Sequence, residues 1–175
     1  LMTSFTRIII SLSFLRSAMG TQQNPPNMVL VGIALFLTLF IMNPVLTEIQ
    51  KNAYEPYKQQ TITQEQALDR AEVPLKRFML RQTEQSSLNM FCDLAQVDAP
   101  ASEEEAMELS MRVVVPSYMT SELKRAFEIG FFLYIPFMLI DIVVSSTLMS
   151  MGMIMLPPAM ISMPFKLLLF VTVDG

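Results

Sequence analysis

The chain has no histidine and only one cysteine, Cys92, among its 175 residues. Without histidine, histidine-based catalytic triads, histidine metal sites and imidazole proton relays are excluded. A single cysteine cannot form a disulfide within the chain or supply a thiolate zinc cluster. As a nucleophile it would lack a histidine base, so we expect a buried or idle thiol. The five glycines are scattered along the sequence, and no glycine-rich phosphate loop is present. We therefore expect a protein that is not an enzyme.

Charged residues are also scarce. They make up 16% of the chain, against about 25% in average globular proteins. Residues 17–47 and 142–165 carry no formal charge, and each stretch is longer than the roughly 20 apolar residues that a membrane-spanning helix needs. Residues 51–125 hold nine of the twelve Lys and Arg and twelve of the sixteen Asp and Glu. This distribution indicates a membrane-class or deeply assembled protein with one polar insert.

The net charge of −4 comes without any basic stripe. Nucleic-acid-binding proteins carry such a stripe because they neutralise phosphates. We therefore expect no nucleic-acid partner.

Residues 1–50 are expected to form an apolar helical hairpin. Its turn is Asn24-Pro-Pro-Asn27, with proline placed where a following helix can begin. Residues 28–42 are apolar on every face, so that helix touches lipid or protein all round. Pro44 interrupts the pattern and predicts a kink in one long helix. The first residues start inside an apolar pattern without a charged signal-peptide region, so we expect the sequence to lack its true beginning.

Residues 51–119 are expected to form a helical polar insert. Thr63 and Gln66 have capping-box spacing ahead of a helix that Pro74 bends or divides. A short helix is expected over Ser86–Gln96.

The end of the insert combines an acidic run with a short apolar segment. Ser102 and Glu105 repeat the capping-box spacing, and Glu103–Glu105 would be favourable in a first helical turn. We interpret the run as helix capping on a solvated face, with a docking patch as the alternative. Residues 111–115 are expected to be extended and stopped by Pro116.

Residues 120–175 are expected to form a second apolar hairpin with a methionine-rich loop. A long helix should begin with Thr120 or Ser121 as its cap and be kinked at Pro136. Glu128 and Asp141 lie within its apolar stretch, where a carboxylate is costly if it faces lipid.

Six methionines fall within residues 149–163, around Gly152 and Pro157-Pro158. Glycine weakens a helix and the double proline disfavours helix before it, so residues 151–156 are predicted to be a loop between two apolar helices. At membrane depth, such irregular backbone is tolerated where protein buries it or where it lines a cavity. Methionine is deformable and fills irregular gaps. Composition alone leaves two interpretations of these methionines. It favours core filler over a compliant seal.

Several longer motifs resemble those of the FliP and SctR family of type III export-gate subunits. They occur in the family's order over nearly the whole chain, and the likeness is weakest around residues 85–112. The matching segments are Thr3-Ser-Phe-Thr-Arg-Ile-Ile-Ile, Asn24-Pro-Pro-Asn, Phe40-Ile-Met-Asn-Pro-Val, Phe132-Leu-Tyr-Ile-Pro-Phe-Met-Leu-Ile-Asp-Ile-Val, Gly152-Met-Ile-Met-Leu-Pro-Pro, Met163-Pro-Phe-Lys-Leu and Val173-Asp-Gly.

The resemblance implies a core channel-forming subunit of the flagellar type III protein export gate. In it, five copies of the chain would join FliR and FliQ, with FlhB and FlhA in the full apparatus. The resulting all-α, ring-like gate would lie in the bacterial inner membrane, in the flagellar basal body. It would pass unfolded flagellar subunits and would need no cofactor or metal. The apolar hairpins would then be packed largely on partner helices, and family members continue into another helix beyond Gly175.

The resemblance also places the family's methionine gasket on Met153, Ile154 and Met155. One position departs from the Met-Met-Met version found in some members. Isoleucine keeps the apolar bulk but is β-branched and stiffer. Five copies would set a ring of apolar side chains at one level, which would dewet the pore and yet flex around a polypeptide. With the resemblance, a gasket is favoured over core filler.

Lys166 is the only basic residue after Arg125, and an ammonium in apolar surroundings requires a partner or water. The resemblance favours Glu122 of a neighbouring subunit, and snorkelling to solvent is the alternative. The role of Asp141 stays open: it can bond Ser145 or another donor, pair with Lys166, or face the channel. The carboxylates available to Lys166 are Glu122, Glu128, Asp141 and Asp174.

Two rival functions also fit the residues. One is a small ion or solute channel or transporter that uses Glu128, Asp141 and Lys166 as intramembrane charges. The other is an intramembrane aspartyl protease that pairs Asp141 with Asp174. Asp174 lacks the flanking motif of such proteases, which disfavours this second rival.

Overall fold

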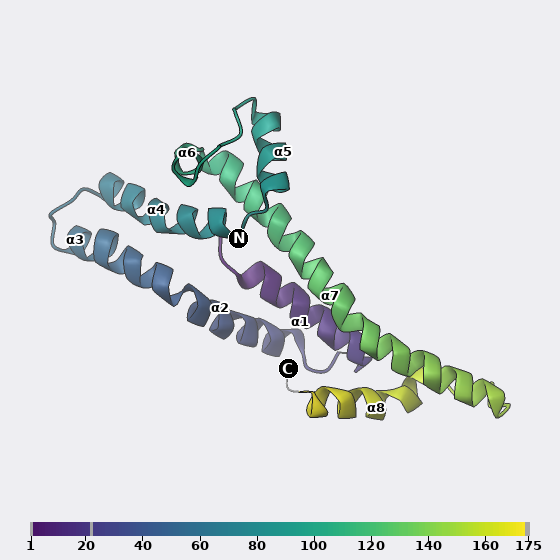
Figure 1. Cartoon of the computed structure of the whole chain (residues 1–175). Coiled ribbons are helices and arrows are strands. Elements are labelled where there is room, and N and C mark those ends of the chain that lie inside the picture. Colours follow the sequence, from purple (N-terminus) through teal and green to yellow (C-terminus); the bar gives the residue numbers. More distant parts are fainter. Residues whose placement is uncertain (1, 22, 174–175) are drawn as a thin grey trace. The chain divides into compact units, whose positions relative to one another are not determined.

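The computed structural model describes residues 2–21 and 23–173. Within these ranges the regular elements are helices and no residue lies in a strand, which confirms the predicted all-α class. The elements are α1 (Phe5–Met19), α2 (Asn27–Ile49), η1 (Gln50–Tyr54), α3 (Glu55–Lys58), α4 (Gln64–Gln82), α5 (Gln85–Ala95), α6 (Glu103–Glu108), α7 (Met111–Ser150) and α8 (Pro158–Thr172) (Figure 1). All are α-helices except η1, which is a π-helix.

The chain divides into two compact units. Unit 1 consists of Leu1–Ile8 and Leu35–Arg125, and unit 2 of Ile9–Ala34 and Ala126–Gly175. Helices α1, α2 and α7 each contribute residues to both units. The predicted division at residues 50 and 119 follows charge composition and stays a prediction.

Residues 27–58 are helical without a gap, over α2, η1 and α3, so the predicted long helix is confirmed. Pro44 lies inside α2, and the change to π-helical hydrogen bonding comes later, at η1. The sequence pattern did not predict that π segment. Asn27–Lys58 and Met111–Ser150 are both long and apolar enough to cross a membrane.

Helix α4 begins with the predicted capping box. The hydroxyl of Thr63 accepts a hydrogen bond from the Gln66 N–H, and the Gln66 side-chain oxygen accepts one from the Thr63 N–H. Pro74 is buried inside α4, and the helix continues through it, so the predicted division of this helix does not occur.

The two short helices of the insert also form where the sequence predicts them. Helix α5 covers the predicted segment to within one residue at each end. At α6, the Ser102 hydroxyl accepts from the Glu105 N–H at 3.2 Å. The Glu105 carboxylate accepts from the Ala101 N–H instead of the Ser102 N–H, so the second half of the capping box is shifted by one residue.

The predicted extended segment 111–115 is wrong, because these residues form the first turns of α7. The hydroxyl of Ser110 accepts from the Arg112 N–H at 3.3 Å and so satisfies one free donor at this helix start. Val114 is fully buried in unit 1, and that burial outweighs the low helix propensity of β-branched residues. Pro116, the predicted stop, lies inside the helix.

Thr120 and Ser121 consequently lie inside α7 as well, and the predicted cap there is wrong. Ser121 has a different part in the fold. Its hydroxyl accepts from the Glu84 N–H at 2.9 Å and donates to the Ser117 carbonyl at 2.9 Å. This contact ties the junction between α4 and α5 to α7 within unit 1.

Unit 1 has two small apolar cores between α7 and the helices of the insert. One contains Met79, Val114 and Tyr118, and the other contains Leu88, Cys92 and Val113. Cys92 is fully buried, as predicted. Burial raises the pKa of its thiol and favours the protonated, less reactive form.

Unit 2 has a core of Ala18, Met19 and Phe137. Next to it, the ring of Phe14 on α1 packs edge-on against Phe127 and Tyr134 of α7, with centroids 5.5 and 6.3 Å apart. Gly130 permits this approach.

We expect Gly130→Ala to destabilise unit 2. A Cβ atom at residue 130 would lie 2.5 Å from Cδ2 of Phe14, so the ring must leave its place between two aromatic neighbours. Such overpacking costs about 1–3 kcal/mol, which over most of that range is more than the roughly 1 kcal/mol that alanine gains over glycine in a helix. Thermal unfolding of the purified protein measures the change.

Gly32→Ala is the matched control, because Gly32 is also helical and a Cβ atom there would have no neighbour within 4 Å. This control should unfold at an equal or higher temperature. A Gly130→Ala variant as stable as the control would show that the Phe14 ring moves freely.

Candidate functional site

Helix α7 ends in a Schellman motif at Gly152. The Met153 N–H donates to the Leu148 carbonyl at 3.0 Å, and the Gly152 N–H donates to the Met149 carbonyl at 3.0 Å. Gly152 has φ +74°, the left-handed conformation that this motif needs. The cap therefore fixes where the helix stops and where the methionine-rich loop starts.

The loop between α7 and α8 confirms the predicted break at residues 151–156. Met153, Ile154 and Met155 follow one another on it, and their exposed fractions are 44%, 87% and 97%. Three consecutive apolar side chains that their own chain leaves so exposed are costly in water. They require a cover of lipid, of protein or of other copies of the same loop.

The two helices that carry the loop are joined by a polar cluster within unit 2. Asp141 on α7 accepts from the Ser162 hydroxyl at 2.6 Å and from Lys166 Nζ at 2.6 Å, one bond to each carboxylate oxygen. Ser162 and Lys166 are one turn apart on α8 and are 0% and 5% exposed. Of the alternatives left open for Asp141, the chain therefore shows pairing with Lys166, and Ser162 takes the place considered for Ser145.

Between these helices lies an apolar groove of about 520 Å³. It contains almost no polar surface, so it suits apolar occupants only. Its lining residues are Leu139, Ile140, Val143, Val144, Thr147, Leu148, Met151, Ile161 and Phe165.

Glu122 lies in a second polar cluster, within unit 1. Its side chain is fully buried and forms an ion pair with Arg7 of α1. The Arg7 guanidinium also donates to Gln82 Oε1 at 3.1 Å, and Arg125 donates to the same oxygen at 3.3 Å. This cluster joins α1, α4 and α7.

A sequence model of the FliP family matches residues 1–175. The chain belongs to the FliP family. The flagellar biosynthetic protein FliP of Pectobacterium carotovorum is 53% identical over 175 residues, which are 100% of this chain and 67% of that protein. The FliP of Bacillus subtilis is 53% identical, with 100% and 78% covered. The FliP of Buchnera aphidicola from Acyrthosiphon pisum is 50% identical, with 100% and 45% covered.

Membership of the FliP family makes the chain a component of flagellar biosynthesis, and its two long apolar helices fit a membrane-associated transport role. Glu122 and Lys166, predicted to pair between subunits, each have a partner within the chain, Arg7 and Asp141. Their pairing between copies stays a prediction. Arg7 and Ser162 are polar partners that the sequence analysis did not single out.

The remaining charged candidates of this FliP-family chain are dispersed. Glu128 is exposed on α7 and makes no ion pair with any residue between 2 and 173 that the structure describes. Asp174 lies outside the described residues. Across those described residues, no group of three or more His, Cys, Asp or Glu side chains is placed to hold a metal ion.

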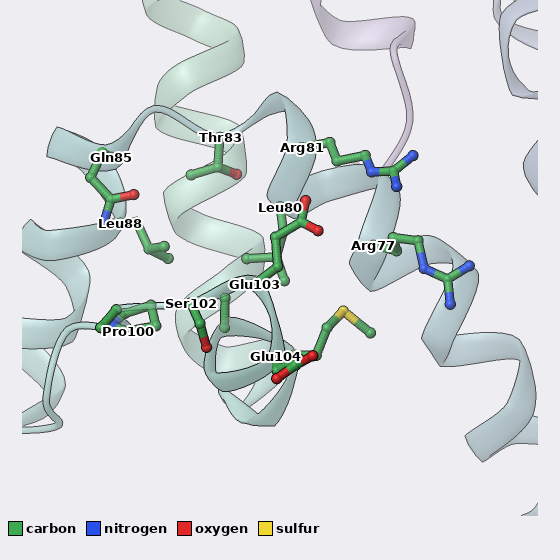
Figure 2. A pocket seen from close by; sticks show the side chains of 13 residues that line it. Arg77, Leu80, Arg81, Thr83, Gln85, Leu88, Pro100, Ser102, Glu103 and Glu104 are labelled. Atoms are coloured by element: carbon green, nitrogen blue, oxygen red, sulfur yellow. The ribbon is translucent and has the colours of Figure 1, made fainter.

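Unit 1 also has an open cleft of about 370 Å³, next to the acidic run at the start of α6. Figure 2 shows Leu80 and Leu88 on its walls, with Glu103 and Glu104 from α6 and Arg77 and Arg81 from α4 at its edge. Arg77 also donates to Glu48 at 3.0 Å. The cleft contains none of the predicted gate or ion-pair residues.

Proposed function

We propose that this chain is a channel-forming subunit of the flagellar type III protein export gate, which passes unfolded flagellar subunits. The observation that carries the proposal is the loop of Met153, Ile154 and Met155, whose apolar side chains are exposed between two apolar helices. Membership of the FliP family supports the same interpretation. In the proposed gate, the loops of five copies pack together and cover the apolar side chains that are exposed in the single chain.

The proposed mechanism is mechanical sealing. A ring of apolar side chains excludes water and so raises the barrier for ions. Methionine is unbranched and deformable, so the ring can widen around a polypeptide and close behind it. Ile154 keeps the apolar bulk, but its β-branched side chain is stiffer than methionine at one of the three positions. The gate supplies no energy in this scheme, and the driving force comes from other parts of the apparatus.

For the ring to close again at the same pore radius, the two ends of each loop must be held rigidly. The cap at Gly152 fixes its first residue, and the bonds from Asp141 to Ser162 and Lys166 hold α7 and α8 together. We propose that assembly also uses Glu122 and Lys166 of adjacent copies to set the register of the ring. The proposed partners are FliR and FliQ, with FlhB and FlhA in the full apparatus of the bacterial inner membrane.

Native mass spectrometry of the detergent-extracted protein, expressed together with FliQ and FliR, tests this proposal. We expect one particle that contains five copies of this chain and copies of both partners. A monomer or dimer that ignores both partners would contradict the export gate. Flux of a solute through the purified chain alone would favour the channel or transporter instead, in which Glu128, Asp141 and Lys166 are the intramembrane charges.

A further inference from the structure

The open cleft of about 370 Å³ in unit 1 has an apolar lining and charged edges. Among its lining residues, Leu88 and Ala106 are buried, and Leu80 and Met107 are partly buried. Small-molecule sites in proteins are clefts of roughly 300 Å³ or more, with apolar walls and a small number of polar groups. The cleft has the size and the lining of such a site.

Four of the polar side chains that line the cleft already have partners within the chain. Their hydrogen bonds are those of Arg77 to Glu48 at 3.0 Å, of Thr83 to the Met79 carbonyl at 2.8 Å, of Gln85 to Asn89 at 2.9 Å and of the Glu105 N–H to Ser102 at 3.2 Å. Arg81, Glu103 and Glu104 make no side-chain hydrogen bond or ion pair with any residue that the structure describes. These three charged groups are therefore available to a ligand.

The acidic run at the start of α6 divides into two parts. The carboxylate of Glu105 accepts a hydrogen bond from the Ala101 N–H at 2.8 Å and so takes part in capping the helix. Glu103 and Glu104 are exposed and lie along the cleft instead. Hydrogen bonding at the helix start therefore accounts for one member of the run, and the docking role considered for this run remains for the other two.

The signs of the three charges restrict the chemistry of the ligand. Arg81 on α4 is a cation, and Glu103 and Glu104 on α6 are anions. In Figure 2 the guanidinium of Arg81 points away from both carboxylates. An anion alone would be repelled by the glutamates, and a cation alone by the arginine. A ligand that pairs with both edges must carry one negative group, one positive group and an apolar part that matches the lining. Amino acids and short peptides with free termini have this combination.

We propose that this cleft binds a small zwitterion with an apolar side chain, either an amino acid or a dipeptide. The ligand's carboxylate accepts from the guanidinium of Arg81, a pairing that suits the planar geometry of both groups. Its ammonium donates to Glu103 or Glu104, and its side chain packs against Leu80 and Leu88. The cleft contains no residue of the methionine-rich loop, so the purified chain should bind the ligand whether or not it assembles into a gate.

Equilibrium dialysis of the purified chain against radiolabelled L-leucine and L-leucyl-L-leucine tests the proposal. We expect saturable binding of at least one of them at one site per chain, and the tighter of the two gives the size of the ligand. N-acetyl-leucine lacks the ammonium and leucine amide lacks the carboxylate. Each should bind about fivefold more weakly than leucine, which is the upper end for an exposed ion pair. Absence of saturable binding of both leucine and the dipeptide would overturn the proposal, and so would equal affinity for the two blocked compounds.

Two variants test which edge of the cleft holds which charge. Arg81→Gln should weaken binding of leucine about fivefold and leave that of leucine amide unchanged, because the amide has no carboxylate to lose a partner. The double variant Glu103→Gln with Glu104→Gln should weaken binding of leucine and spare N-acetyl-leucine. Arg70→Gln is the matched control, because Arg70 is also exposed on α4 but does not line the cleft. It should bind leucine like the unchanged chain. Equal weakening of leucine and leucine amide by Arg81→Gln would contradict the assigned contact.

Discussion

Replacing Met153, Ile154 and Met155 together with glycine should make the assembled channel leak small ions. The three side chains are the apolar surface of the loop, with Met155 at 97% exposure in the single chain. In the proposed gate, their removal would lower the barrier that a dewetted ring presents to ions. Ion flux should rise about tenfold for each 1.4 kcal/mol by which that barrier falls. Conductance of the reconstituted complex in a lipid bilayer is the measurement.

The control variant changes the same three residues to leucine. It keeps the apolar bulk and does not add the flexibility that glycine gives to a loop, so it should stay closed to ions. Both variants should assemble normally, because the loop lies beyond the polar cluster that joins α7 to α8. A glycine variant that assembles and does not leak would contradict the gasket. The three side chains would then only fill space against a partner.

The position of this loop could be predicted from sequence because its signals are local. Gly152 and the double proline determine which residues leave the helix, and neither depends on distant neighbours. The capping box of α4 was predictable for the same reason. The Schellman geometry itself was missed, although glycine directly after a helical run is its usual signature.

The start of α7 shows where local signals fail. Three successive valines before Pro116 favour extended backbone on propensity alone. Packing of Val113 and Val114 against the insert decides the outcome instead, and that packing involves residues distant in sequence. Arg7 was missed as the partner of Glu122 for a related reason. Nothing near Glu122 in the sequence shows that the start of α1 lies beside it.

The largest stability effect is expected from Asp141→Asn. This change leaves Lys166, whose side chain is 7% exposed, without its carboxylate. Losing one partner of a fully buried pair costs about 3–5 kcal/mol. The Asp141 side chain is 42% exposed, so water partly replaces it and the loss should fall below that range. Chemical unfolding of the purified chain measures the difference.

The double variant Asp141→Asn with Lys166→Met removes the stranded charge and keeps the length of the side chain at residue 166. Because no uncompensated ammonium remains, we expect it to recover most of the lost stability. If the double variant is as unstable as Asp141→Asn alone, the stranded charge is not the cause of the loss, and the ion pair is not what holds α7 to α8.

The same pair of variants separates the two partners considered for Lys166. If Lys166 acts only within its own chain, the double variant should restore both the stability of the chain and the yield of the five-copy particle. If Lys166 also pairs with Glu122 of an adjacent copy, stability returns and the yield of the particle stays low, because methionine cannot donate to a carboxylate. Full recovery of both quantities would therefore remove Lys166 from the subunit interface and leave it as a residue that joins α8 to α7 beneath the methionine-rich loop.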